Sequence, residues 1–179
     1  MLNIHRKHRK LSRGKELSFL GLFVAIGLAC IDSIWALYMN GFGLSESRIG
    51  FISAFLVILS ILFTIFSTPI IEYFKQTKIL FFSLISSVVA YFFIGLVDSL
   101  SFFLAMAALL TISGILRVEC LDILFRDNTP KKDLNKEEGF LYSLLNLGWL
   151  IGPLIAGFFM LKFNLASVFF VSAFFFLIS

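Results

Sequence analysis

Residues 146–159 read NLGWLIGPLIAGFF, and this stretch decides the fold. Gly148, Gly152 and Ala156 recur every four residues, so on a helix they share one face with almost no side-chain bulk. Such a face lets a neighbouring helix approach backbone to backbone. Pro153 removes one backbone hydrogen bond, a loss that membrane helices tolerate better than soluble ones. The stretch therefore predicts a bent, closely packed transmembrane helix.

Composition places the whole chain in a membrane. Hydrophobic residues make up 59% of 179 residues and charged residues only 15%, whereas soluble domains carry about 25% charged residues. Cys30 and Cys120 lie inside apolar runs without a spacing pattern, so neither a disulfide framework nor a metal site is expected. The basic residues behind the net charge of +4 cluster at the ends of apolar runs. This clustering favours membrane orientation over nucleic-acid binding.

Six apolar runs predict an all-α bundle of six transmembrane helices. The first begins after a basic tail, residues 1–16, which carries His5 and His8 as solvated side chains. Asn164 is expected to cap the sixth helix, and Asn135 with Glu138 to form a capping box before the fifth. The sixth run has only about 15 residues, roughly 22 Å of helix against a core of about 30 Å, so we expect the chain to be cut off inside it. The spans are expected at residues 17–39, 49–71, 79–97, 100–121, 141–161 and 165–179.

The distribution of basic residues predicts the orientation. Twelve Lys and Arg residues fall in the N-terminal tail and in the connections between spans two and three and between spans four and five. The opposite side has only Arg48 and Lys162. Cytoplasmic loops carry the excess of Lys and Arg, so the N-terminus is expected in the cytoplasm of a multi-pass protein of the plasma (inner) membrane.

Asp32 is the one acid set well inside an apolar run, and intramembrane acids usually mark ion or proton pathways. Gly21, Ala25, Ala29 and Ala36 fall on or near its helical face, which predicts room for water or substrate around the carboxyl. Asp32 is therefore a candidate proton or cation site. It could instead lie near the outer interface, solvated or bonded to neighbouring helices. Trp35 and Tyr38 either line the same cavity or belong to the interfacial aromatic belt.

The segment GWLIGPLIAG, residues 148–157, resembles the fifth-helix signature of the major facilitator superfamily, Gly-x-x-x-Gly-Pro-x-x-Gly-Gly. Ala156 replaces one glycine, and Gly157 completes the helix-packing motif. A second segment, TPIIEYFKQTK at residues 68–78, resembles the loop between helices two and three of that family, although both glycines are missing. The resemblance makes Glu72 a candidate cytoplasmic latch, with Lys75 and Lys78 beside it. The alternative is a solvated turn at the interface.

Four charges lie toward the cytoplasmic end of the fourth span. Family helix four often carries a functional arginine, and the resemblance extends weakly to Arg117, for which snorkelling to the interface is the preferred explanation. Glu119, Asp122 and Arg126 lie near one helical face, and Asp122 and Arg126 are spaced as an i,i+4 ion pair.

The resemblance covers nearly all of the chain and implies the N-terminal half of a major facilitator transporter. Such a protein moves a small molecule by alternating access, and this chain would need a C-terminal six-helix half or a partner chain. Proton coupling and export are the favoured finer expectations. No catalytic motif, cofactor or nucleic-acid partner is expected. The alternative function is a non-transporting membrane scaffold or regulatory subunit.

Overall fold

The structure is a computed structural model that describes residues 13–179. This part of the chain contains six α-helices, one short 3-10 helix (η1) and no strand, which confirms the predicted all-α bundle. The first twelve residues of the predicted basic tail, with His5 and His8, lie outside the described residues. The elements are α1 (Arg13–Gly41), α2 (Glu46–Tyr73), α3 (Gln76–Ile94), α4 (Leu100–Asn128), η1 (Lys131–Asp133), α5 (Leu134–Lys162) and α6 (Leu165–Ile178).

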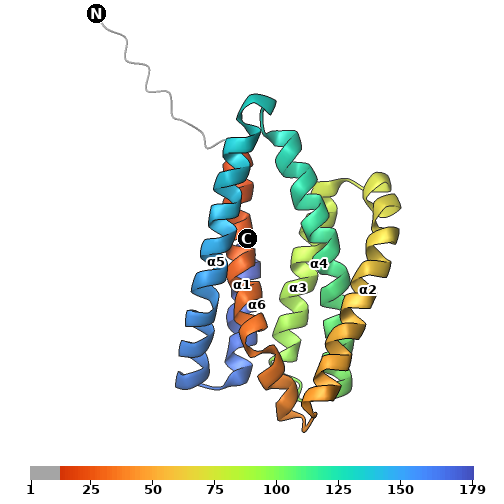
Figure 1. Cartoon of the computed structure of the whole chain (residues 1–179), viewed down its shortest axis with the longest axis vertical. Helices are drawn as coiled ribbons and strands as arrows, with labels where there is room; N and C mark the ends of the chain where they lie inside the picture. Colours follow the sequence, from red (N-terminus) through yellow and green to blue (C-terminus); the bar gives the residue numbers. More distant parts are fainter. Residues whose placement is uncertain (1–12) are drawn as a thin grey trace, which may run out of the picture.

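The helices run alternately up and down (Figure 1). Helices α1 to α5 are long and apolar enough to cross a membrane, and α6 is a shorter apolar helix of 14 residues. The turn between α2 and α3 and the connection between α4 and α5 lie at the end of the bundle where α1 begins. This arrangement puts on one side the connections that carry the excess of basic residues.

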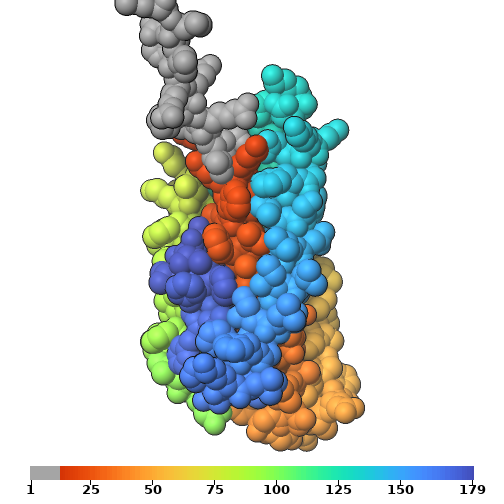
Figure 2. Space-filling model, turned by 90° about the vertical axis from the view of Figure 1, so that its left-hand side faces the viewer, coloured from red at the N-terminus to blue at the C-terminus, as the bar shows by residue number. Residues whose placement is uncertain are grey.

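Two groups of helices make up the bundle. Helix α1 packs against α5 and α6, α4 packs against α3 and α2, and contact between α3 and α6 joins the groups. Figure 2 shows α1 as a narrow strip between α5 and α6 on one face of the molecule. The hydroxyl of Ser172 on α6 donates to the carbonyl of Gly27 on α1 at 3.0 Å, an interhelical hydrogen bond of the kind that supports membrane bundles.

The closest approach in the bundle joins α1 to α5 along the predicted small-residue face. Gly148, Gly152 and Ala156 are buried on α5. A Cβ atom on Gly148 would stand 2.7 Å from the Cβ of Ala25, and one on Gly152 would collide with the Cβ of Ala29. Either added atom would also stand about 3.0 Å from backbone atoms of α1. Glycine is therefore required at both positions by the approach of the two backbones.

The packing motif is narrower than the sequence predicts. A Cβ on Gly157 would meet nothing within 4 Å in the described part of the chain, and Pro153 is exposed. The physical reason is helical rotation, since each of these residues lies about 100° around the helix from its buried neighbour. Helix α5 continues through Pro153. The carbonyl of Gly152 accepts a hydrogen bond from the Cys30 thiol at 3.2 Å, which adds a polar contact to the α1–α5 interface.

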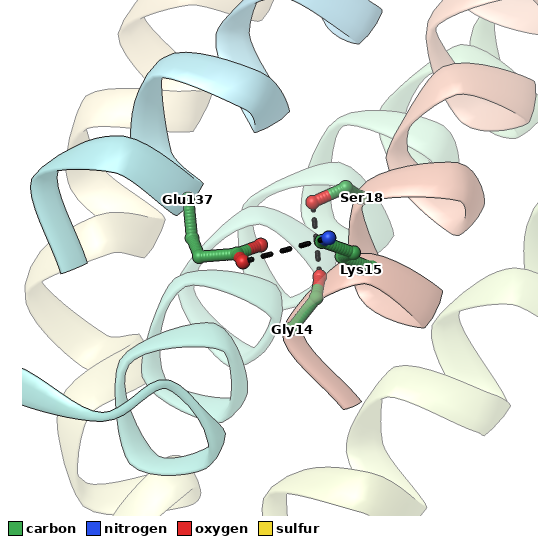
Figure 3. Close-up of polar contacts among 4 residues, drawn as sticks. All are labelled: Gly14, Lys15, Ser18 and Glu137. Carbon is green, nitrogen blue, oxygen red and sulfur yellow. Dashed lines mark hydrogen bonds and ion pairs between the residues drawn. The ribbon is translucent and has the colours of Figure 1, made fainter. Parts of the chain in front are cut away.

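One ion pair joins α1 to α5 at the end of the bundle where α1 begins, beside a hydrogen bond within α1 (Figure 3). The Lys15 Nζ lies 4.0 Å from Glu137 Oε1, and the Ser18 hydroxyl donates to the carbonyl of Gly14 at 2.9 Å. Because Lys15 is partly exposed, this ion pair contributes little stability and mainly fixes the register of the two helix ends.

One of the two predicted helix N-caps is confirmed and the other is wrong. The Asn164 side chain accepts a hydrogen bond from the Ser167 amide at 2.8 Å, so the predicted cap of α6 is confirmed. The predicted capping box of Asn135 and Glu138 is wrong, because α5 already begins at Leu134, directly after the 3-10 helix η1. Glu138 instead approaches Arg126 across the connection, at 3.8 Å.

The α1–α5 interface predicts different tolerance at two glycines of one helix. Gly152→Val should lower the free energy of unfolding by about 1–3 kcal/mol, because the new side chain overpacks the contact with Ala29. Gly157→Val should change the free energy of unfolding by less than about 0.5 kcal/mol, because a Cβ at Gly157 contacts no other described residue. Thermal unfolding of both variants in the same detergent provides the measurement. Equal destabilisation of the two variants would show that the α1–α5 contact does not require glycine at position 152 in particular.

Candidate functional site

A cavity of about 470 Å³ lies along α4, between α1 and α2. Ala107, Thr111 and Gly114 are the small residues on the α4 face that lines it. Leu28 and Trp35 of α1 and Thr64 of α2 flank that face, and Tyr91 of α3 and Phe169 of α6 also contribute. Its volume falls in the range of small-molecule sites, about 300–1,000 Å³. The charged lining residues are Arg117 and Glu119, both on α4.

Arg117 lies deep between α4, α3 and α6. Its side chain is only 4% exposed, and Nη1 donates to the hydroxyl of Ser87 at 2.9 Å. The guanidinium carbon sits 4.8 Å from the ring centroid of Phe176, a cation–π contact. Nε is buried without a hydrogen-bond partner among the described residues. Arg117 is thus held in place by one hydroxyl and one aromatic face.

No carboxylate neutralises this guanidinium within residues 13–179. The ion pairs found there are Lys15–Glu137 and Arg126–Glu138, both at the ends of helices. Placing an arginine in the centre of a membrane helix costs at least about 2.5–3.5 kcal/mol on insertion scales. A buried cation kept at that cost is a functional candidate rather than a packing residue.

The expectation that Arg117 snorkels to the membrane surface is wrong. Helix α4 continues to Asn128, beyond the predicted span end at residue 121, so Arg117 lies about 16 Å of helix before its end. The side chain of Arg117 is only 4% exposed and bonds to Ser87 of α3, so it is held between helices and does not extend to the membrane surface. Its charge therefore stays inside the bundle.

The other charges of α4 separate into different surroundings. Glu119 is half-buried and lines the same cavity as Arg117, while Asp122 and Arg126 are exposed. Arg126 pairs with Glu138 of α5, and no ion pair with Asp122 is found in the described chain. The predicted i,i+4 pair on α4 is thus replaced by a contact that joins α4 to α5.

The surroundings of Asp32 differ from those predicted from the small residues near it on α1. The small residues Gly21, Ala25 and Ala29 are buried, and α5 fills the space in front of them. Asp32 is exposed and does not line the cavity beside Arg117. The space that these small side chains leave is therefore taken by another helix and is not room around the carboxyl.

The two aromatic residues of α1 have separate surroundings. Trp35 lines the cavity, and its Nε1 donates to the Ser53 hydroxyl of α2 at 3.2 Å. Tyr38 packs against Phe103 and Phe169 and donates to the carbonyl of Ile94 at 3.4 Å. Trp35 and Arg117 thus line the same cavity at different levels of α4, since Trp35 packs on Phe103, and Tyr38 belongs to the aromatic cluster around Phe103.

The candidate latch extends from the end of α2 across the turn into the first residues of α3. Glu72, Lys75 and Lys78 are all exposed, and Lys75 is the residue before α3 begins. None of the three makes an ion pair within the described residues. Their side chains are available to another surface, as a latch requires, and equally to solvent.

Sequence reasoning missed Ser87, Tyr91 and Gly114 as neighbours of Arg117. Ser87 follows Ser83 by one helical turn, and Gly114 precedes Arg117 by three residues. Hydroxyl groups recurring in an apolar helix are a signal for a buried polar partner. The sequence alone does not show that Arg117 is the partner of Ser87, because it does not give the rotation of α3 relative to α4.

The Ser87–Arg117 contact predicts a specific stability loss. Ser87→Ala leaves Nη1 of Arg117 without an acceptor and should lower the free energy of unfolding by about 1–3 kcal/mol. Ser60→Ala is the matched control, since the partly exposed Ser60 hydroxyl donates only to the carbonyl of Val57 in its own helix. We expect that control to stay within about 0.5 kcal/mol of the parent in thermal unfolding. A stable Ser87→Ala protein would show that the hydrogen bond does not hold the guanidinium.

Comparison with known proteins identifies the family. The family model described as Major Facilitator Superfamily matches residues 17–179, which includes all but the first turn of the described bundle. No individual curated protein matches the chain. The six-helix architecture and the residues matched agree, and the chain therefore belongs to the major facilitator superfamily, a family of membrane transporters.

Proposed function

We propose that this chain is the N-terminal half of a secondary active transporter that moves a small molecule by alternating access. The observation that carries the proposal is the cavity beside α4, which is open at the bundle surface between α1 and α2 and holds a buried cation. In alternating access, two six-helix halves rock about a binding site near the membrane midplane. One half provides one wall of such a site.

The exposed helix faces support a need for a second bundle. Phe51 and Phe55 on α2 and Leu150 and Leu154 on α5 are all exposed large side chains. Lipid covers some of this surface in a membrane, and a matching half from the same or another chain covers the rest. Glu72 is exposed on the side with the excess of basic residues, where a latch between halves would act.

The finer features are proton coupling and export, with the N-terminus in the cytoplasm of the plasma (inner) membrane. Asp32 is the proposed coupling acid. Its exposure on this bundle supports a carboxyl that faces the second half rather than the interior of the first. The direction of transport rests on the resemblance of the GWLIGPLIAG segment to the fifth helix of exporters.

The orientation is testable with single cysteines. Ser47→Cys, at the start of α2, should react with a membrane-impermeant maleimide added to intact cells, whereas Lys132→Cys, in η1, should react only after the membrane is opened. Both parent side chains are exposed, while native Cys30 and Cys120 are buried and provide a low background. The reverse labelling pattern would place the N-terminus outside.

Proton coupling is testable at Asp32. In the complete transporter, Asp32→Asn should abolish accumulation driven by a pH gradient, because an amide cannot carry the proton, while the protein still inserts in the membrane. Asp98→Asn, an exposed carboxyl between α3 and α4, is the matched control and should retain transport. Uptake of whichever compound the parent moves, measured in proteoliposomes with an imposed pH gradient, gives the answer. Unchanged pH-driven flux in Asp32→Asn removes this residue from the mechanism.

A further inference from the structure

We propose that the cavity binds organic monocarboxylates and that Arg117 holds their carboxylate group. The inference rests on the proposed function, since it names the substrate class of the same site. It starts from the incomplete set of partners around the guanidinium. Arginine has five N–H donors, of which Nη1 bonds to Ser87 and Nε has no partner among the described residues.

The guanidinium borders the cavity at Gly114. A Cβ added to Gly114 would lie 3.6 Å from Nη2 of Arg117, and both residues line the cavity. The missing side chain therefore leaves open the side of the guanidinium that carries Nη2. Because Arg117 is nearly fully buried, a ligand reaches it from the cavity rather than from bulk water.

The chemistry of the remaining donors selects a carboxylate. Guanidinium presents parallel N–H groups that match the two oxygens of a carboxylate, and such charge-assisted bonds are stronger than neutral ones. An anion bound there neutralises a charge that no protein carboxylate neutralises within residues 13–179. A neutral ligand leaves that charge uncompensated.

The charged residues that line the cavity favour a ligand with one negative charge. Arg117 is the one cationic residue among those that line the cavity, and Glu119 is the one acid. A second negative charge on the ligand would find no cation and would meet the field of Glu119. This balance favours a monoanion over a dianion such as a phosphate monoester.

The rest of the lining accommodates an apolar body. Trp35, Tyr91 and Phe169 supply aromatic surface, and Ile31 and Leu28 supply aliphatic surface. A carboxylate at Arg117 thus directs a hydrophobic ring or chain along α4 toward the open side of the cavity. The complementary ligand is an aromatic or aliphatic monocarboxylate.

Three probes of equal ring size and different charge test the proposal directly. Benzoate, benzyl alcohol and benzylamine are titrated into the full-length protein in detergent. Binding is measured by isothermal titration calorimetry, which needs no label near Arg117. Benzoate should bind at least about ten-fold more tightly than either other probe, a margin expected for one charge-assisted contact. Equal binding of the three probes, tighter binding of benzylamine, or no binding of any probe overturns the proposal.

Variants then assign the charge selectivity to one residue. Arg117→Gln should remove the preference for benzoate, whereas Arg126→Gln, an exposed arginine of the same helix, should leave it unchanged. If Arg117→Gln fails to fold, Gly114→Val tests the same contact. The valine side chain would cover Nη2 of Arg117 and should weaken benzoate binding several-fold. A retained preference for benzoate in folded Arg117→Gln, or unweakened benzoate binding in folded Gly114→Val, contradicts the assignment.

The test separates this inference from the proposed function. Charge-selective binding without movement of any compound in proteoliposomes would leave the anion site standing and contradict transport. Transport of neutral or cationic compounds by a protein that does not prefer benzoate would leave transport standing and contradict the anion site.

Discussion

The bundle depends on the close approach of α1 and α5. Inside a bilayer, lipid tails are as apolar as the side chains, so helices associate through van der Waals contact and interhelical hydrogen bonds. Gly148 and Gly152 permit that contact, because any side chain there would strike Ala25 or Ala29. The Cys30 thiol adds a hydrogen bond across the same interface. Helix α6 then joins α1, and α3 joins α6, so the position of α1 sets the positions of the others.

The α1–α5 contact also decides where a ligand can bind. With its small residues covered by α5, α1 turns Leu28 and Trp35 toward α2 and α4, and the cavity forms there. At its inner boundary Arg117 is held by Ser87 and Phe176 but remains without a counter-charge in the described chain. Packing and binding therefore use different faces of the same helix, which allows a rigid core beside an open cavity.

The sequence predicted the elements well and the site only in part. Trp35 and Arg117 were both singled out, but the explanation preferred for Arg117 was wrong, because its side chain is buried against α3 and α6 and bonds to Ser87 there. Asp32 was selected for its rarity inside an apolar run, and small neighbours were interpreted as empty space. In the fold another backbone occupies that space. The prediction that Gly148 and Gly152 contact a neighbouring helix is correct. Gly157 lies on a different face of α5, away from α1.

The sequence by itself determined the number, type and order of the helices, because a backbone in lipid must satisfy its own hydrogen bonds and apolar length then sets each span. It also determined that Gly148 and Gly152 would meet a neighbouring helix. Only the tertiary structure decided that this neighbour is α1, and that Ser87 of α3 faces Arg117 of α4. The periodicity of a helix that is apolar on every side does not specify its rotation, so the partners of a buried charge emerge only when all six helices pack together.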